Sequence, residues 1–274
     1  MTEQPGRPHA SLFAGAVDEF TDAQLRPRVL DDIDAERDHR KARLAAAYRV
    51  FARFGYDNWV TGHITVRDPE HHDRFWVNSF ARSWHLMRAS DLVLVDREGA
   101  IVEGRGQVNA AAFAIHSEIH RSRPDAVAVA HAHSPAAQAW SIHGQTIAPL
   151  TQDCCAFFED HEVFDAYSGV VYGTDEGAAI AEALGGSKAL LLRHHGLLTV
   201  GGSVDEAAFW LHLLEQCCAL HLRIVPSGRL EGVARIDDRM ARHAHDQVGQ
   251  PLHGWLGFQP LFELEVARDP SFVG

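Results

Sequence analysis

Residues 126–134, with the sequence AVAVAHAHS, decide the fold of this chain and contain its most informative pair of side chains, His131 and His133. Alanine and valine alternate before the histidines, and turn-forming residues precede them, which predicts a short buried strand. Because strand side chains repeat every two residues, both histidines share a face with the valines, and small alanines line the opposite face. Two imidazoles at a strand end can bind one metal ion, or can be ordinary histidines with hydrogen-bond partners in the protein. The spacing alone leaves both interpretations open.

The composition is that of a globular protein with an acidic balance. The 274 residues are 46% hydrophobic and 23% charged, which is enough for a sizeable core. The net charge is −12 and Lys and Arg form no block, so we expect no nucleic-acid partner and no binding to membranes. Histidine is enriched, with 19 residues, and imidazole is the commonest metal ligand in proteins.

The cysteines and the N-terminus predict a cytoplasmic protein. Cys154-Cys155 and Cys217-Cys218 are adjacent pairs without C-x-x-C spacing, and we expect them to be small buried side chains in a reducing compartment. The first 20 residues lack the charged start and long apolar run of a signal peptide. No stretch approaches the roughly 20 apolar residues of a membrane span.

Short strands and helices surround the histidine strand. Four strands upstream, separated by turn residues, predict an antiparallel meander: 59–67, 74–78, 91–96 and 100–104. The last buried strand is expected at 189–196, which also ends in histidines, and 149–158 is a candidate strand. Periodicity and capping residues predict helices at 33–54, 109–122, 136–142, 175–184, 203–221 and 236–248.

These elements predict one α/β domain with a mixed sheet over residues 33–225. Residues 1–32 show no periodicity and are expected to be an N-terminal extension. Residues 226–274 are expected to be a C-terminal helical tail that packs on the domain or on a neighbouring subunit.

Three segments resemble the class II aldolase/adducin family in their order and spacing: GHITV at 62–66, RPDAVAVAHAHS at 123–134 and LLLRHHGLLTVG at 190–201. The resemblance covers about residues 40–222. It implies a three-layer α/β/α domain with a central mixed, largely antiparallel sheet. It also implies a small-molecule substrate and a homo-oligomer, usually a tetramer, with active sites near subunit interfaces.

The resemblance further implies that one divalent metal ion is held by His131, His133 and His195. Three neutral imidazoles leave coordination positions open, which is a catalytic rather than a structural pattern. The sequence does not choose between zinc, manganese and iron, because availability and geometry decide which metal such a site takes.

The chain departs from the sugar-phosphate aldolases of the family at the helix before the histidine strand. Those enzymes carry two phosphate-binding serines and then an acid/base glutamate, and the matching positions here are Ala110, Ala111 and Ala112. The loop at 78–81, Asn-Ser-Phe-Ala, is also bulkier than its counterpart. A ketose-phosphate substrate is therefore not expected, and the chain resembles the adducin-like branch that lacks the Ser-Ser-Glu triplet.

Five further residues are candidates for the site. His63 and His116 are the expected catalytic assistants, although a buried structural role for the first and a core hydrogen bond for the second are open alternatives. Asn78, Ser79 and Arg82 are expected to bind substrate, with Arg82 either pairing with a carboxylate or lying exposed on the surface.

Other polar residues near these motifs are given structural roles. His194 neighbours a ligand but is expected on the opposite face of its strand, in a supporting role. Glu118 lies too far round its helix to replace the missing glutamate. Residues 159–161, Glu-Asp-His, are expected to form a solvated turn.

Three functions are compatible with such a site. The first is a divalent-metal-dependent lyase that cleaves a C–C bond, by aldol-type cleavage or decarboxylation, in a small non-phosphorylated hydroxy- or oxo-carboxylate, either aromatic or aliphatic. The second is a non-haem iron(II) oxygenase that performs oxidative decarboxylation on the same fold. The third is a non-catalytic adducin-like module, against which the complete set of three histidines argues.

Overall fold

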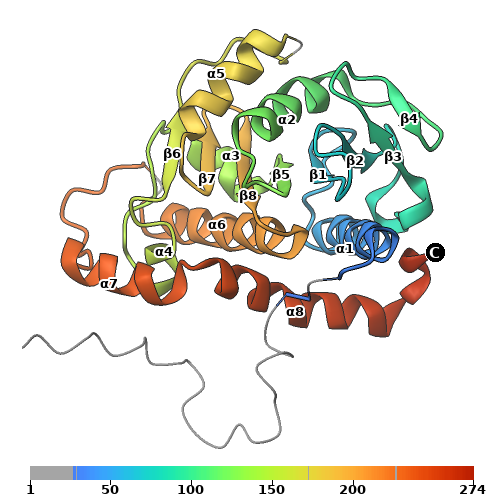
Figure 1. Cartoon of the computed structure of the whole chain (residues 1–274). Helices are drawn as coiled ribbons and strands as arrows, with labels where there is room; N and C mark the ends of the chain where they lie inside the picture. Colours follow the sequence, from blue (N-terminus) through green and yellow to red (C-terminus); the bar gives the residue numbers. More distant parts are fainter. Residues whose placement is uncertain (1–26, 29, 172, 226) are drawn as a thin grey trace, which may run out of the picture.

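One eight-stranded sheet carries the fold (Figure 1). The computed structural model of the chain describes residues 27–28, 30–171, 173–225 and 227–274, so most of the expected N-terminal extension, residues 1–32, lies outside the described residues. The strands are β1 (His63–Arg67), β2 (Phe75–Asn78), β3 (Leu92–Val95), β4 (Ile101–Glu103), β5 (Ala128–Ala132), β6 (His161–Phe164), β7 (Ala189–Leu192) and β8 (Gly196–Gly201). Their order across the sheet is β4-β3-β2-β1-β5-β8-β7-β6. Only the β6–β7 pair is parallel among these, which makes the sheet mixed and largely antiparallel as predicted.

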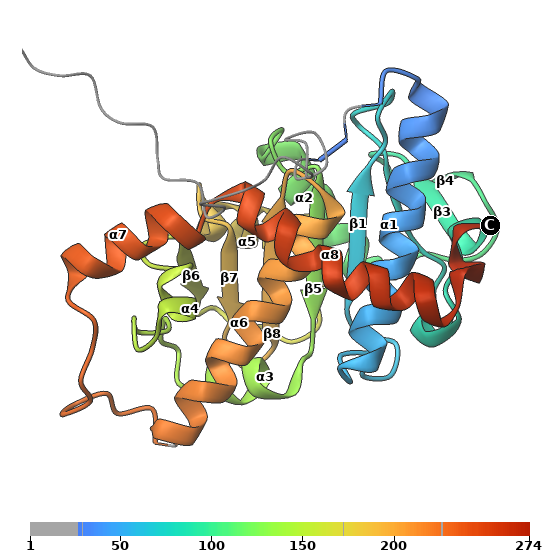
Figure 2. The same cartoon turned by 90° about the horizontal axis from the view of Figure 1, so that it is seen from below.

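Helices cover both faces of the sheet. They are α1 (Ile33–Arg53), α2 (Ala110–Ser122), α3 (Pro135–Ser141), α4 (Gln152–Cys155), α5 (Thr174–Leu184), α6 (Val204–Ile224), α7 (Asp238–Val248) and α8 (Pro251–Arg268), with short 3-10 turns at Trp84–Leu86, Ala89–Asp91 and Pro270–Val273. Helices α2 and α5 lie on one face and α1 and α6 on the other, which gives the three α/β/α layers (Figures 1 and 2). Helix α8 crosses the outer side of α6 and α1 (Figure 2).

Side-chain caps begin the helices that frame the site. The Asn109 side chain accepts a hydrogen bond from the Ala111 N–H at 2.9 Å and starts α2. At α6, the Ser203 hydroxyl accepts from the Glu206 N–H at 3.1 Å, and the Glu206 carboxylate accepts from the Gly202 N–H at 2.8 Å. Both helix starts were predicted from these residues.

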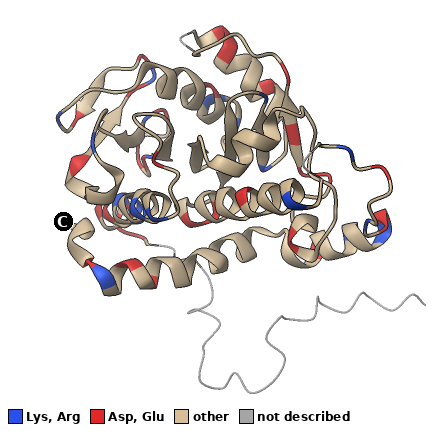
Figure 3. Ribbon diagram, turned by 180° about the vertical axis from the view of Figure 1, so that it is seen from behind, with Lys and Arg blue, Asp and Glu red and all other residues tan. Residues whose placement is uncertain are grey.

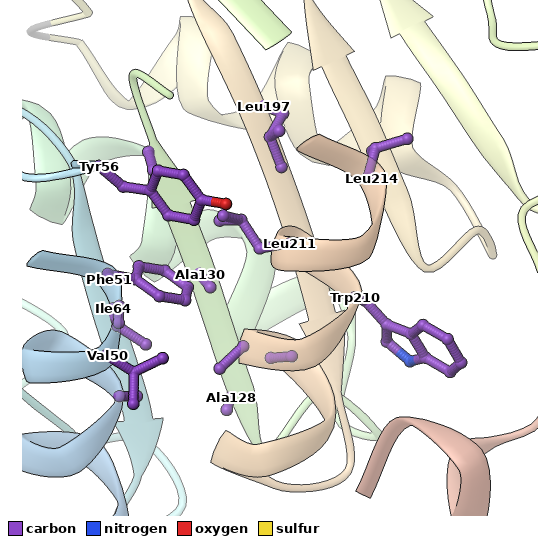
Figure 4. Packing of buried hydrophobic residues seen from close by; sticks show 14 of the residues in the cluster. Val50, Phe51, Tyr56, Ile64, Ala128, Ala130, Leu197, Trp210, Leu211 and Leu214 are labelled. Carbon is purple, nitrogen blue, oxygen red and sulfur yellow. The ribbon is translucent and has the colours of Figure 1, made fainter. Parts of the chain in front are cut away.

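The alternation along β5 divides the core into two layers. Ala128 and Ala130 belong to the cluster on the α1/α6 side, and Figure 4 shows Leu211 of α6 reaching over Ala130. Val129 belongs to the cluster on the α2/α5 side. Because side chains alternate, His131 lies on the α2/α5 side as well. The small alanines let α6 approach the sheet closely, and the histidine is left on the opposite face.

Three expectations about local structure were wrong. The candidate strand at 149–158 contains helix α4, whose first turn is capped by the Thr151 side chain. His161 is buried and begins β6, rather than lying in a solvated turn, because it pairs in parallel register with Ala189 of β7. The strand expected at 189–196 ends at Leu192, and the chain reverses in a turn into β8, which was not predicted.

Charged residues are spread over the described part of the chain. Figure 3 shows Lys and Arg dispersed among Asp and Glu rather than gathered on one element. No helix of the described residues is both long and apolar enough to cross a membrane.

Candidate metal centre

Three histidines meet where β5 ends and β8 begins. His131 lies in β5, His133 follows its last residue, and His195 directly precedes β8. Strands β5 and β8 are antiparallel neighbours with Ala132 opposite Leu197, so the end of one strand meets the start of the other. One ligand nitrogen from each histidine lies within 4.8 Å of the others, and the ring centroids are 4.6–5.1 Å apart.

Hydrogen bonds hold the His131 ring and the backbone of His195. The Nδ1 atom of His131 lies 2.8 Å from the Leu197 carbonyl oxygen, and because a carbonyl only accepts, the proton sits on Nδ1. The Nε2 lone pair of His131 is therefore the atom available to a metal, as is usual when the other ring nitrogen is hydrogen-bonded to the protein. The Gln138 side chain donates to the His195 carbonyl oxygen at 3.2 Å and holds the turn.

All three imidazoles are neutral at physiological pH. Burial lowers the pKa of His195 to about 4. Burial and the neighbouring His195 lower the pKa of His133 to about 4. Burial is also the main reason why the pKa of His131 lies well below its usual range, and the neighbouring histidines lower it further. Three neutral nitrogen donors that converge on one point fit a divalent ion, because metal ligands must be unprotonated.

The triad lies in a cavity of about 560 Å³ with largely apolar walls. The apolar lining comes from Val60, Phe80, Val108, Ile115, Val170 and Val171. No Lys, Arg, Asp or Glu lines the cavity among the residues that the structure describes. A larger hollow of about 1050 Å³, between residues 144–149 and 227–238, contains no member of the triad.

The first turn of α2 faces this cavity with methyl groups. Ala110 and Ala111 both line it, and Ala112 is buried behind them. These are the positions where the sugar-phosphate aldolases were expected to carry serine, serine and glutamate. The cavity wall therefore offers neither hydroxyl nor carboxylate there.

His63 and His116 lie next to the triad. His63 lines the cavity, stands opposite His131 in the β1–β5 register, and has its ring centroid 5.1 Å from that of His131. His116 packs behind it with a centroid distance of 4.6 Å and is fully buried. Burial lowers the pKa of both rings well below the usual range, with the neighbouring histidines adding to the effect, so both are neutral.

The structure does not bring the three expected substrate-binding residues to the cavity. The Asn78 amide oxygen lies 2.7 Å from the Tyr48 hydroxyl, and neither Asn78 nor Ser79 is among the lining residues. Arg82 is half-exposed and pairs with Asp91 at 3.1 Å. Phe80, from the same loop, reaches the cavity in their place.

Three cavity residues were missed or misplaced by sequence reasoning. His194 lies in the turn between β7 and β8 with φ 60° and lines the cavity, because the strand alternation that would have turned it away ends at Leu192. Tyr167 lines the cavity from a loop and has its ring centroid 5.9 Å from that of His194. Gln138 lines the cavity because its helix, α3, starts directly after the histidine strand. This closeness in the sequence could have predicted its place.

The acidic residues near the motifs are held in ion pairs elsewhere. Glu118 pairs with Arg121 at 2.6 Å. Glu159 pairs with Arg242, and Asp160 lies 3.0 Å from the Lys188 ammonium group.

Comparison with known proteins identifies the family of the chain. A model of the family described as "Class II Aldolase and Adducin N-terminal domain" matches residues 42–222. "Decarboxylase NovR" of Streptomyces niveus is 46% identical over 250 residues, which are 90% of this chain and 92% of that protein. A "4-hydroxy-3-prenylphenylpyruvate oxygenase/4-hydroxy-3-prenylbenzoate synthase" of Streptomyces roseochromogenus subsp. oscitans is 46% identical over 90% of this chain and 89% of its own.

A solved structure shares the fold over most of the chain. The L-fuculose 1-phosphate aldolase from Glaciozyma antarctica PI12 superposes with a TM-score of 0.81 and 38% identity, covering 89% of this chain and 95% of its own. The predicted family and the predicted α/β/α fold are confirmed. The chain belongs to the class II aldolase and adducin family.

Proposed function

We propose that the chain is a divalent-metal-dependent lyase that cleaves a C–C bond, by decarboxylation or aldol-type cleavage, in a small non-phosphorylated hydroxy- or oxo-carboxylate with an aromatic or other apolar group. One observation carries this proposal: the three-histidine centre lies in an apolar cavity whose described lining contains no charged Lys, Arg, Asp or Glu. The positive charge that attracts an anionic substrate must then come from an ion held by His131, His133 and His195.

The cavity favours a carboxylate over a phosphate. A bound phosphate carries up to two negative charges and several acceptor oxygens, and burying these without paired donors is costly. Ala110 and Ala111 supply no hydroxyl for such oxygens, and their methyl groups extend the apolar wall. A carboxylate with an adjacent oxo or hydroxyl oxygen needs only a cation and one or two hydrogen bonds, and the apolar wall suits its aromatic part.

A divalent ion bound at the triad supplies Lewis acidity and a positive charge for a chelating pair of oxygens. Among the described residues, His63 is the neutral imidazole outside the triad that lies between the ligands and α2, and its ring lines the cavity beside the substrate. The fully buried His116 supports His63 from behind. The apolar lining, with Phe80 and Tyr167 at its edge, would pack against the apolar part of the substrate.

An O2-dependent oxidative decarboxylation is the second candidate, and the oxygenase name of a relative with 46% identity favours it. An all-histidine centre with open positions accepts iron(II) as well as zinc or manganese. The two candidates therefore share a site and differ in the metal and in the need for O2.

We further propose that the chain forms a homo-oligomer, a tetramer in the first instance, with the cavity near a subunit interface. Large apolar side chains surround the mouth of the cavity and are exposed: Val60, Phe80, Tyr167 and Val170. Exposed apolar groups gathered around a site are typical of surfaces that another subunit covers.

Elemental analysis of freshly purified protein, combined with turnover assays under air and under argon, tests the proposal. The substrate is an aromatic 2-oxo acid such as 4-hydroxyphenylpyruvate, and L-fuculose 1-phosphate is the phosphorylated control. We expect about one divalent ion per chain and release of CO2 without O2 uptake. Bound iron with obligatory O2 uptake would show that the chain is an oxygenase and not a lyase. Protein that binds no metal would exclude both enzyme functions.

A further inference from the structure

Tyr48 of α1 reaches with its hydroxyl group between the ends of strands β1 and β2. The side chain is fully buried, and its ring packs edge-on against the Trp84 ring with the centroids 5.0 Å apart. The hydroxyl oxygen accepts a hydrogen bond from the Ile64 N–H at 2.8 Å and lies 3.4 Å from the backbone nitrogen of Asn78. It also lies 2.7 Å from the Ile64 carbonyl oxygen and 2.7 Å from the Asn78 side-chain oxygen, and it donates its single proton to one of these acceptors. One phenol therefore contacts polar groups of both strands.

The hydroxyl takes the place of one hydrogen-bonded pair of the sheet. The β1–β2 ladder stops one pair short of Ile64 and Asn78, which would face each other if its register continued. In an antiparallel ladder, hydrogen-bonded pairs recur at every second residue. The Asp68 N–H donates to the Arg74 carbonyl oxygen at 3.0 Å, so the pair of Ile64 and Asn78 further along the same register would also be a bonded one. Tyr48 instead binds groups that this pair would have joined, and the two strands part there.

The strands part at the edge of the cavity. His63 lines the cavity from the start of β1, and Phe80 lines it from the loop that follows Asn78 at the end of β2. This loop has a second attachment, because the Phe80 N–H donates to the Gln107 carbonyl oxygen at 2.7 Å. Tyr48 is not itself one of the lining residues. Its hydroxyl nevertheless anchors the start of the loop that carries Phe80.

Loss of this hydroxyl would leave buried backbone groups without their partner. Ile64 is fully buried, so its N–H and carbonyl groups cannot turn to water instead. In Tyr48→Phe the ring would still stand between the strands, so Ile64 and Asn78 could not form the missing pair. The end of β1 and the start of the loop should therefore loosen rather than close up.

We propose that Tyr48 is a positioning residue of the candidate site: its hydroxyl holds β1 and β2 apart at the cavity and keeps Phe80 in contact with the apolar part of a bound substrate. Tyr48 acts only through the loop, whereas Phe80 sets the preference for a ligand with an aromatic or other apolar group. The ligand part of this proposal rests on the proposed function, whereas the anchoring of the two strands does not.

Hydrogen exchange followed by mass spectrometry tests the anchoring in the full chain. Tyr48→Phe removes the hydroxyl and keeps the ring. Tyr56→Phe is the matched control, because the hydroxyl of this buried tyrosine lies 2.9 Å from Nδ1 of His212 and the residue does not line the cavity. We expect amide exchange in the peptides that contain Ile64 and Asn78 to become about 10-fold faster in Tyr48→Phe only. Unchanged exchange in either peptide, or a similar acceleration in Tyr56→Phe, would overturn the anchoring.

Two 2-oxo acids test the ligand part, because phenylpyruvate and pyruvate share their chelating group and differ in the phenyl ring. In zinc-loaded protein, calorimetry should show phenylpyruvate binding about 10-fold more tightly than pyruvate, or better. Tyr48→Phe and Phe80→Ala should each reduce this ratio about 5-fold, whereas Tyr56→Phe should keep it. The double variant should do no more than Phe80→Ala alone, because Tyr48 acts through Phe80. Additive effects, or an unchanged ratio in Tyr48→Phe, would contradict the role of Tyr48.

Two outcomes separate this inference from the proposed function. If the unmodified protein binds neither 2-oxo acid, the proposed function fails, and hydrogen exchange alone decides whether Tyr48 anchors the strands. If it binds both and Phe80→Ala leaves their ratio unchanged, the ligand part fails and the proposed function stands. Should Tyr48→Phe fail to fold, Asn78→Ala takes its place, because it removes the side-chain oxygen 2.7 Å from the hydroxyl. Asn78→Ala should reduce the ratio in the same way, and an unchanged ratio would contradict the anchoring at β2.

Discussion

His63 of β1 and His131 of β5 stand directly opposite each other in the antiparallel register, with ring centroids 5.1 Å apart. His131 belongs to the histidine triad and His63 does not, yet the register of the sheet holds them together. Strand register is fixed wherever one face is buried, and here both faces are. The same strand pairing therefore positions both the His63 ring and the His131 ring, without any direct bond between them.

Replacement of the triad should remove metal binding and leave the fold intact. His131→Ala and His195→Ala each delete one of three converging nitrogens, and loss of a ligand should lower metal affinity at least 100-fold. Equilibrium dialysis with elemental analysis measures the affinity, and gel filtration with circular dichroism checks the fold. His194→Ala is the matched control, because His194 lies in the same turn but outside the triad. Full metal retention in either triad variant would show that the ligand set is wrong.

The sequence predicted the parts of this site that depend on short-range spacing. Two histidines separated by one residue after an alternating run can share a face of one strand, and the resemblance supplied His195 as the third member of the triad. The helix caps at Asn109 and Ser203 were also readable, because a cap and the N–H groups that it binds are only two or three residues apart. These features need little knowledge of how distant elements pack.

The parts of the site that depend on how distant elements pack could not be predicted from the sequence. Strand β8 was missed because the residues after the histidines are as apolar as those of β7, so the two strands look like one in the sequence. The chain reverses between them at His194, which has a left-handed backbone conformation. The pairing of Arg82 with Asp91 depends on how a loop folds back. Thr65 and His116 are 51 residues apart, so their contact follows only from the packing of α2 against β1.

The close packing of α2 against α5 depends on a glycine in α5. A Cβ atom added at Gly177 would overlap the carbonyl oxygen of Ala114 in α2. Gly177→Ala should therefore destabilise the protein by about 1–3 kcal/mol through overpacking, although alanine favours an isolated helix. Urea unfolding measures the change. Gly186→Ala is the control, because its added Cβ meets no described atom within 4 Å. Equal effects of the two substitutions would show that the helices are not in close contact at Gly177.

A buried carboxylate holds the helix that follows the triad. Glu215 of α6 accepts hydrogen bonds from the Ser134 hydroxyl at 2.6 Å and from the N–H groups of Ala136 and Ala137, each at 2.7 Å. Glu215→Gln keeps the shape but replaces one accepting oxygen by a donor, which leaves an N–H group without its partner. We expect a loss of about 2–3 kcal/mol in the free energy of unfolding, measured in urea.

A second readout connects Glu215 to the site, because Ser134 directly follows His133, a proposed metal ligand. The metal affinity of Glu215→Gln should fall while its ligand set stays complete. Glu182→Gln is the matched control: this glutamate is exposed, and its substitution should change stability by less than about 0.5 kcal/mol. Unchanged stability in Glu215→Gln would show that the carboxylate does not hold α3.

The stability of the fold should fall in acid through Asp68, at the end of β1. Burial alone would raise the pKa of this carboxyl, but hydrogen bonds from Arg37, from the N–H groups of His71 and Glu70 and from the Trp76 indole lower it to about 2, against an ordinary value of 3.8. A carboxyl whose pKa is lower in the folded state stabilises that state above its ordinary pKa, and this stabilisation is lost as the pH falls from about 4 toward 2. Asp68→Asn cannot titrate, so the unmodified chain should exceed it in free energy of unfolding by about 1–2 kcal/mol at pH 7, and the gap should shrink to less than about half of that by pH 2.5. Urea unfolding of both proteins between pH 7 and pH 2.5 measures the gap, and subtracting one curve from the other cancels the contributions of other groups. A gap that stays constant over this range would show that Asp68 does not gain its stability from the charged form.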